Sequence, residues 1–161
     1  MHKEAFEFVD RWQRVISRPR SVLEVGSRNV NGSVRGLFPC SQYIGIDTRT
    51  GPGVDVVADG ASWDGWGRKF DLVLCLEVLE HAADQEGLCR NLLRLAARSG
   101  VILVTAAGPQ RVPHGADGEA VQPGESYRNV SWSDLRAWFG GAELCAVEDM
   151  GEDIRAVILA R

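Results

Sequence analysis

Short apolar runs alternate with polar or amphipathic segments along this chain, and the alternation limits the folds open to it. The runs are short and rich in β-branched residues, as in SVLEV, YIGID and GVILV, which is typical of strands buried on both faces. Between several of them, apolar residues recur at the spacing of a helix. Strands that alternate with helices form a parallel sheet with helices on both faces. The sequence therefore predicts an α/β fold.

The order of the segments predicts one sheet that closes with a hairpin. We expect helices over residues 84–97 and 131–139, the second with Ser131 as its N-cap. The two final apolar runs flank the turn GED, so they should form an antiparallel β-hairpin. The predicted architecture is a seven-stranded, mostly parallel sheet in a single domain over residues 1–161. Its strands are expected at residues 21–27, 41–48, 54–60, 70–81, 99–107, 142–150 and 154–161.

The first twenty residues predict an amphipathic helix that precedes the sheet. Pro19 should end it, because proline cannot continue a helix. The apolar residues of this segment recur at steps of three or four and form its expected buried face: Phe6, Val9, Trp12, Val15 and Ile16.

Length, composition and charge narrow the class of protein. The chain has 161 residues, of which 45% are hydrophobic and 25% charged, enough to bury a substantial core. No apolar run approaches the ~20 residues that span a bilayer, and the charged N-terminus lacks the apolar region of a signal peptide. We therefore expect a cytoplasmic protein with no membrane partner. The net charge of −4 disfavours a general nucleic-acid binder, which needs a basic face.

The four cysteines are expected to be buried, reduced thiols. None of them has the CxxC spacing of a zinc site. Cys75 and Cys145 lie in apolar runs, where a thiol behaves as a small apolar side chain; the others are Cys40 and Cys89.

Acidic residues near the ends of three predicted strands indicate a ligand site. Ligands of such sheets bind at the carboxyl ends of the strands. Asp47 follows Gly26 by 21 residues, a spacing that suits the two hydroxyls of a ribose. A dinucleotide site would need GxGxxG, but the turn reads GSRNVNG. Glu24 would also repel a pyrophosphate and favour a positively charged ligand. S-adenosylmethionine, which has a sulfonium, an ammonium and a ribose but no phosphate, meets these demands.

Four segments resemble the successive motifs of class I S-adenosylmethionine-dependent methyltransferases. They are VLEVGSRNVNGSVRGLF, YIGIDTRTGPGVDVVADG, FDLVLCLEVLEH and GVILVTAAG. The terminal hairpin also matches that family, and nicotinamide-binding Rossmann domains lack it. The resemblance covers about residues 20–160 and implies a methyltransferase of Rossmann-like fold. The chain departs from the family in the first motif, where Arg28 replaces the usual second glycine.

The resemblance implies a role for each part of the cofactor site. Glu24 and Gly26 would line the methionine portion, Asp47 would take the ribose hydroxyls, and Asp59 would meet the adenine amine. Trp63 could cover the adenine, although a tryptophan in a loop more often fills the core. The full set of implied cofactor-binding residues is Glu24, Gly26, Ser27, Arg28, Gly32, Ser33, Asp47, Thr48, Asp59, Gly60, Ala61, Leu76 and Glu77.

Methyl transfer needs alignment and exclusion of water, and a base only where the acceptor loses a proton as it attacks. The candidate catalytic residues are His81, His114 and Tyr127. The last two lie in a polar connection over residues 106–130, which we expect to fold over the cofactor as a lid. With no separate recognition domain, the connection and the first helix should shape the acceptor pocket, which leaves room for a homodimer whose partner subunit completes it.

The acceptor stays open at this point. A small molecule is the main expectation, and Glu77-x-x-Glu80-His81 resembles the signature of small-molecule methyltransferases. Alternatively, the same residues with His114 would bind a divalent metal, because the chain is similar here to small-RNA 3′-terminal 2′-O-methyltransferases. Our main expectation includes no metal and no nucleic acid. A nicotinamide-dependent oxidoreductase and a non-catalytic S-adenosylmethionine-binding module are the remaining alternatives.

Overall fold

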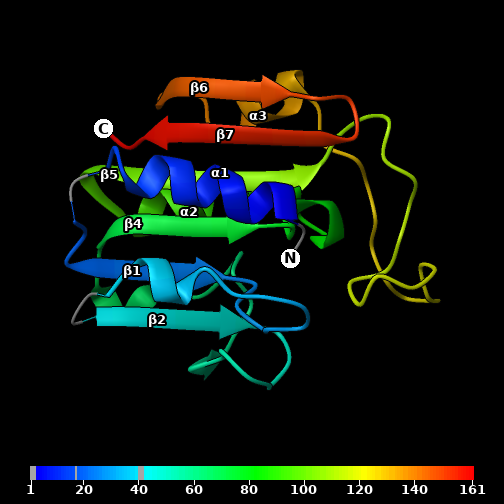
Figure 1. Ribbon diagram of the computed structural model, residues 1–161, viewed down its shortest axis with the longest axis horizontal. Helices are drawn as coiled ribbons and strands as arrows, with labels where there is room; N and C mark the ends of the chain where they lie inside the picture. Colours follow the sequence, from blue (N-terminus) through cyan, green and yellow to red (C-terminus); the bar gives the residue numbers. More distant parts are fainter. Residues whose placement is uncertain (1–2, 17, 40–41) are drawn as a thin grey trace.

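The computed structural model of the chain, which describes residues 3–16, 18–39 and 42–161, contains the predicted seven-stranded sheet (Figure 1). The strand order is β3-β2-β1-β4-β5-β7-β6. The first five strands run parallel, whereas β7 is antiparallel to both β5 and β6. The strands are β1 (Ser21–Val25), β2 (Gln42–Asp47), β3 (Val56–Val57), β4 (Phe70–Leu76), β5 (Ala96–Ala107), β6 (Glu143–Asp149) and β7 (Asp153–Leu159).

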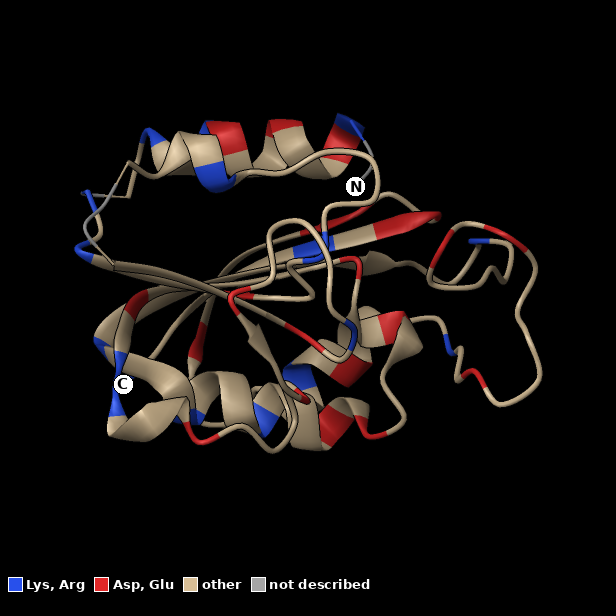
Figure 2. Cartoon of the chain, turned by 90° about the horizontal axis from the view of Figure 1, so that it is seen from below, with Lys and Arg blue, Asp and Glu red and all other residues tan. Residues whose placement is uncertain are grey.

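Helices cover both faces of the sheet, as the continuous apolar strands predict (Figure 2). α1 lies on one face, and α2 and α3 lie on the other. No helix among the described residues is long and apolar enough to cross a membrane. The helices are α1 (Lys3–Gln13), α2 (Gln85–Leu95) and α3 (Trp132–Trp138), and the short 3₁₀ turns are η1 (Arg35–Leu37), η2 (Gly65–Gly67) and η3 (Leu79–His81).

Alternate side chains of the strands fill two separate cores. In β4, Leu72 and Leu74 pack on the α1 side with Phe8 and Val9 of that helix. The residue between them, Val73, belongs to the core on the side of α2. Because every second residue points to the same face, the uninterrupted apolar sequence of β4 is needed to supply both cores.

The topology brings the ends of the central strands together. β1 lies between β2 and β4, so the chain leaves β1 toward one side and returns on the other. This reversal is the switch point at which doubly wound sheets bind ligands. The connection from β5 to α3 runs past the same ends of the strands (Figure 1).

α3 begins with a capping box. The Ser131 side chain accepts from the Asp134 amide at 3.2 Å, and the Asp134 carboxylate accepts from the Ser131 amide at 2.9 Å. Ser131→Ala removes the first of these bonds and should lower the free energy of unfolding by about 1 kcal/mol. Urea denaturation measures this loss. Ser62→Ala, at an exposed turn residue, is the control; an equal effect of both changes would contradict the capping role.

The structure corrects several predicted boundaries. The third strand comprises only Val56–Val57 instead of residues 54–60, because Asp59 forms a turn in which its backbone oxygen accepts from the Ser62 and Trp63 amides. The fourth strand ends at Leu76, and Glu80 and His81 lie in the separate turn η3. Asp84 then caps α2 by accepting from the Gly87 amide.

The leading helix ends at Gln13 and not at Pro19, and three burial predictions are wrong. The buried residues of α1 are Ala5, Phe8 and Val9, whereas Phe6 and Val15, which lies beyond the end of the helix, are exposed. Cys145 is exposed as well, since it is the extra residue where the register of the edge strand β6 shifts. Cys75 and Cys89 are buried thiols, as predicted, and Cys40 lies outside the described residues.

Candidate functional site

A cavity of about 280 Å³ lies at the carboxyl ends of the parallel strands. It brings together most of the residues predicted from the sequence, from β1, β2, β4 and the turns that follow them. Ser33, Ala61 and Tyr127 do not line it. The predicted residues that do are Glu24, Gly26, Ser27, Arg28, Gly32, Asp47, Thr48, Asp59, Gly60, Leu76, Glu77, His81 and His114.

The turn after β1 is held tightly against β2. The amides of Gly26 and Ser27 both donate to the Ile46 carbonyl, at 2.9 and 3.0 Å. Gly26 has a φ of +77°, a conformation that favours glycine. A Cβ at this position would also lie 2.1 Å from Cγ2 of Val78. The sequence predicted a turn at Gly26, but it did not reveal that Val78, in the turn after β4, lies against this glycine.

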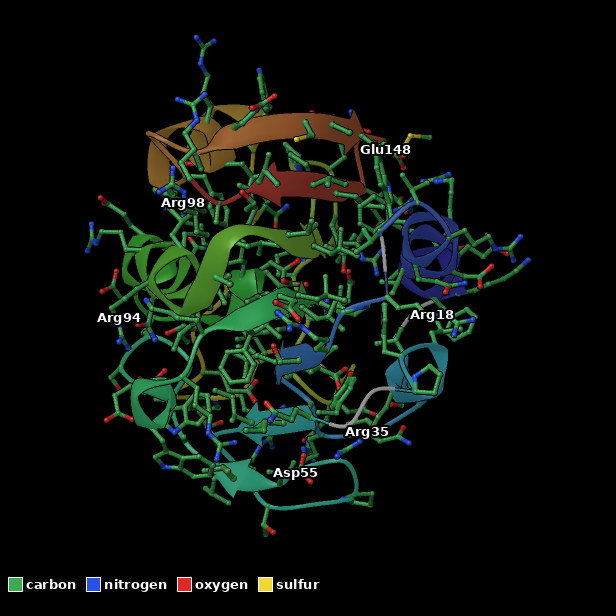
Figure 3. All side chains as sticks on the ribbon, turned by 90° about the vertical axis from the view of Figure 1, so that its left-hand side faces the viewer. Arg18, Arg35, Asp55, Arg94, Arg98 and Glu148 are labelled. Atoms are coloured by element: carbon green, nitrogen blue, oxygen red, sulfur yellow. The ribbon has the colours of Figure 1, made fainter. Side chains whose placement is uncertain are left out.

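Glu24 is a buried acid inside β1, with 7% of its surface exposed. The Tyr43 hydroxyl donates to its Oε2 at 2.9 Å, and the Arg35 guanidinium lies 4.7 Å from the centre of the Tyr43 ring. Arg35 is in turn paired with Asp55 at 3.0 Å (Figure 3). Burial raises the pKa of Glu24 to about 7, against the lowering effect of the Tyr43 bond. Glu24 therefore titrates near neutral pH.

Two aspartates of the cavity also shape the turns in which they lie. Asp47, the last residue of β2, accepts from the Arg49 amide at 2.9 Å and from the Arg28 amide at 3.3 Å. Asp59 accepts from the Ala61 amide at 2.9 Å. These bonds are the usual turn chemistry of aspartate, yet both residues also line the cavity. The two residues thus combine a local structural role with availability to a ligand.

Two glutamates with buried carboxylate oxygens follow β4. Glu77 has a φ of +57°, and its amide donates to the Thr105 carbonyl at 2.8 Å. Glu80 is fully buried, with Oε1 accepting from the Ala107 amide at 3.2 Å. Within the described part of the chain, Oε2 of each glutamate has no hydrogen-bond partner. Burial and the adjacent Glu77 raise the pKa of Glu80 to about 8.

The three predicted catalytic residues form one cluster. The rings of His81, His114 and Tyr127 lie edge to face, with centroids 5.1 to 5.5 Å apart. Burial, followed by the charge of His114, lowers the pKa of His81 to about 4, so this ring is neutral at physiological pH. Nδ1 of His114 lies 3.1 Å from the Val112 carbonyl. The Tyr127 hydroxyl is buried and has no partner among the described residues.

The two histidines of this cluster, together with Glu80, have the composition of a metal site. Glu80, His81 and His114 each offer one ligand atom, and these atoms lie within 4.8 Å of one another. A carboxylate with two imidazoles suits a divalent cation of borderline character. The bond from Nδ1 of His114 to a carbonyl would leave its Nε2 free to ligate.

The long connection between β5 and α3 contributes one wall of the cavity. Residues 114–118 line it. Arg128 anchors the end of the connection to α2 and α3, whereas Asn129 joins this end to Arg111 near the start of the connection. Arg128 bonds Gln85 at 3.0 Å and Asp134 at 2.7 Å. Asn129 donates to the Arg111 carbonyl at 2.9 Å.

Other lining residues escaped the sequence analysis. Arg49 follows Asp47 by two positions, and its proximity to the site could have been inferred from that spacing. Val30, Ala58 and Leu88 are apolar and carried no signal. Trp63 is buried in the core and does not line the cavity.

No protein-family model matches the chain, and no curated protein sequence matches it either. Solved structures do match over nearly its whole length. The N-methyltransferase NodS from Bradyrhizobium japonicum WM9, in complex with S-adenosylhomocysteine, has a TM-score of 0.71 and 13% identity, covering 98% of this chain and 86% of that one.

Two further structures extend this comparison. One is the 1,6-didemethyltoxoflavin-N1-methyltransferase of Burkholderia thailandensis with 1,6-didemethyltoxoflavin and S-adenosylhomocysteine bound. It has a TM-score of 0.71 and 13% identity, and the match covers 98% of this chain and 77% of that one. The N-terminal domain of EvdMO1, in the presence of S-adenosylhomocysteine and D-fucose, has a TM-score of 0.69 and 16% identity. The match covers 99% of this chain and 83% of that one. The chain therefore has the Rossmann-like fold of these methyltransferases.

Proposed function

We propose that this chain, which has the fold of class I S-adenosylmethionine-dependent methyltransferases, binds S-adenosylmethionine and transfers its methyl group to a small molecule. One observation carries the proposal: three strand-end regions supply acids, Glu24, Asp47 and Asp59, to a single cavity. Such a wall suits a ligand with a ribose, an amine and a sulfonium better than one with a pyrophosphate. The similar folds solved with S-adenosylhomocysteine support the same ligand.

The residues of the cavity fit this cofactor. Ser27 Oγ and Glu77 Oε2 are buried without a partner in the described chain, and such atoms are rare unless a ligand or water satisfies them. Asp47 would accept from the ribose hydroxyls and Asp59 from the adenine amine. Glu24 and Gly26 would face the methionine portion, with Leu76 and Glu77 nearer to the sulfonium.

The bound cofactor would supply an activated methyl group whose leaving thioether is neutral. The protein would then contribute mainly alignment and the exclusion of water. Residues 114–118 cover one side of the cavity and would exclude water there. His81, which is neutral because burial lowers its pKa to about 4, would accept a hydrogen bond from the acceptor. His114 and Tyr127 would complete the wall of the acceptor site.

A second candidate function uses a metal at the same place. The close approach of Glu80, His81 and His114 favours metal-assisted transfer, including transfer to a ribose 2′-hydroxyl of RNA. Calorimetric titration with Mn²⁺ and methyl transfer in the presence of a chelator test it. Metal-independent turnover and no binding of Mn²⁺ would leave the small-molecule function, whereas loss of turnover on chelation would favour the metal.

Turnover separates an enzyme from a binding module. The chain is incubated with S-adenosylmethionine and a panel of small hydroxyl and amino compounds, and S-adenosylhomocysteine is quantified. We expect product with at least one member and none without an acceptor. Binding of the cofactor without turnover on small molecules or RNA would instead support the non-catalytic module. We also propose a cytoplasmic location and a homodimer.

Asp47→Ala should weaken binding of S-adenosylhomocysteine roughly 10- to 150-fold, as expected for the loss of charge-assisted hydrogen bonds worth ~1.5–3 kcal/mol. Isothermal calorimetry measures the change. Asp47→Asn keeps an oxygen that can accept from a turn amide, so it separates loss of charge from collapse of the turn. Asp10→Ala, on α1, is the control. Unchanged affinity in both Asp47 variants would remove this residue from the site.

A further inference from the structure

The cavity is rich in acids and has two guanidinium groups. Among its lining residues, the positive charges belong to Arg28, in the turn after β1, and Arg49, which follows β2. The carboxylates belong to Glu24, Asp47, Asp59, Glu77 and Asp117. A ligand with an amino-acid group carries a carboxylate that these acids would repel. Its carboxylate must therefore meet one of the two arginines or a backbone amide.

Both guanidinium groups bind the same acid. Asp117, on the long connection, is bonded to Arg28 through Oδ1, and Arg49 Nη1 lies 3.0 Å from Asp117 Oδ2. These two hydrogen bonds hold the pKa of Asp117 below its usual range. The pair of arginines thus already accommodates a carboxylate, supplied by the protein itself, across the mouth of the cavity.

Arg28 is more buried and more closely packed than Asp117. The Arg28 amide donates to Asp47, and the stem of its side chain passes so close to Gly51 that a Cβ there would lie 2.9 Å from Arg28 Cγ. Only 23% of the Arg28 side chain is exposed, against 48% for Asp117. Asp117 stands between Gly115 and Gly118, the latter with a φ of +86°. Movement of this short segment is therefore cheaper than movement of Arg28.

We propose that Arg28 and Arg49 form the subsite for the carboxylate of the ligand's amino-acid group, and that Asp117 occupies this subsite until the ligand displaces it. The proposal rests on the proposed function, since it takes the ligand to be S-adenosylmethionine or its product. Bidentate pairing makes arginine well suited to a carboxylate. Arg28, which stands where the family has its second glycine, then determines specificity for the amino-acid carboxylate of the ligand.

Displacement would also connect the ligand to the wall of the acceptor site. His114 lies three positions before Asp117 on the same segment, and both line the cavity. Release of Asp117 frees this segment to adjust around the ligand. A nucleoside that lacks the carboxylate would leave the two ion pairs intact.

Calorimetric titration with two probes tests the subsite. S-adenosylhomocysteine has the amino-acid carboxylate, and 5′-methylthioadenosine has the same nucleoside without it. Asp117→Asn removes the competing charge, so it should strengthen binding of S-adenosylhomocysteine about 3- to 10-fold, a size typical of exposed ion pairs. Arg28→Gln should weaken it about 10-fold. Neither variant should change the affinity for 5′-methylthioadenosine by more than about twofold, which also shows that each variant is folded.

Glu119→Gln, which changes another exposed acid of the connection outside the cavity lining, is the matched control and should leave both affinities unchanged. The proposal is overturned if Asp117→Asn leaves the affinity for S-adenosylhomocysteine unchanged or weakens it, or if both probes respond in parallel. If the wild-type chain binds neither probe, the proposed function fails and the subsite fails with it. If it binds both and the variants behave as wild type, only the subsite fails.

Discussion

Glu24→Gln is expected to stabilise the fold at pH 8 by about 3 kcal/mol while it weakens binding of S-adenosylhomocysteine. The reason is the cost of burying a charged carboxylate in β1. Burial raises the pKa of Glu24 from 4.5 to about 7, so the folded chain holds this proton more tightly than the unfolded chain does. The neutral amide of glutamine avoids the cost and can still accept from the Tyr43 hydroxyl.

The raised pKa of Glu24 also determines how its contribution to stability changes with pH. Between about pH 4.5 and pH 7 the folded state binds more protons at Glu24 than the unfolded state. The contribution of Glu24 to stability therefore falls as the pH rises through this window, and the full cost is present above it. Urea denaturation of both proteins at pH 4.5 and pH 8 measures the difference. Glu86→Gln, at an exposed position on α2, is the control. A gain at pH 8 no larger than the gain at pH 4.5 would contradict this account.

Gly26→Ala should lower the free energy of unfolding by roughly 2–5 kcal/mol and abolish detectable cofactor binding. The left-handed backbone costs an L-residue about 1–2 kcal/mol, and the overlap of the new Cβ with Val78, 2.1 Å away, adds the ~1–3 kcal/mol typical of an overpacked site. Relief of this overlap requires movement of the turn against which the ligand would lie. Thermal and urea denaturation, with calorimetry of S-adenosylhomocysteine, measure both effects.

A double variant separates the two costs. Val78→Ala combined with Gly26→Ala removes the overlap but not the backbone strain, so it should recover part of the lost stability. Gly36→Ala is the control, because a Cβ there would meet nothing within 4 Å. A Gly26→Ala protein as stable as wild type, with unchanged affinity, would show that the turn does not need its glycine.

Much of the fold could be predicted because its signals are local. A buried parallel strand needs apolar residues on both faces, so VLEV and DLVLCL were recognisable as strands of such a sheet. Asp47 lies at the end of its strand, Asp59 two residues after the end of β3, and Glu24 one residue before the end of β1. The brevity of β3 was not predictable, because the turn at Asp59 depends on bonds that its backbone and side-chain oxygens accept, which the β-branched sequence before it does not reveal.

Contacts between distant segments could not be predicted from one sequence. Arg28 and Asp117 are 89 positions apart, and opposite charge alone does not tell which of the 22 acidic residues pairs with Arg28. The contact of Gly26 with Val78 depends in the same way on the parallel pairing of β1 with β4. The exposed position of Cys145 follows from a shift in strand register, which hydrophobicity alone does not reveal.

The central claim is that the cavity at the ends of β1, β2 and β4 takes an S-adenosyl ligand and not a dinucleotide. Calorimetric titration of the wild-type chain with S-adenosylhomocysteine and, separately, with NAD tests this claim most directly. We predict saturable binding of S-adenosylhomocysteine at one site per chain and no binding of NAD, because Glu24 and the GSRNVNG turn disfavour a pyrophosphate. Binding of NAD without binding of S-adenosylhomocysteine would contradict it.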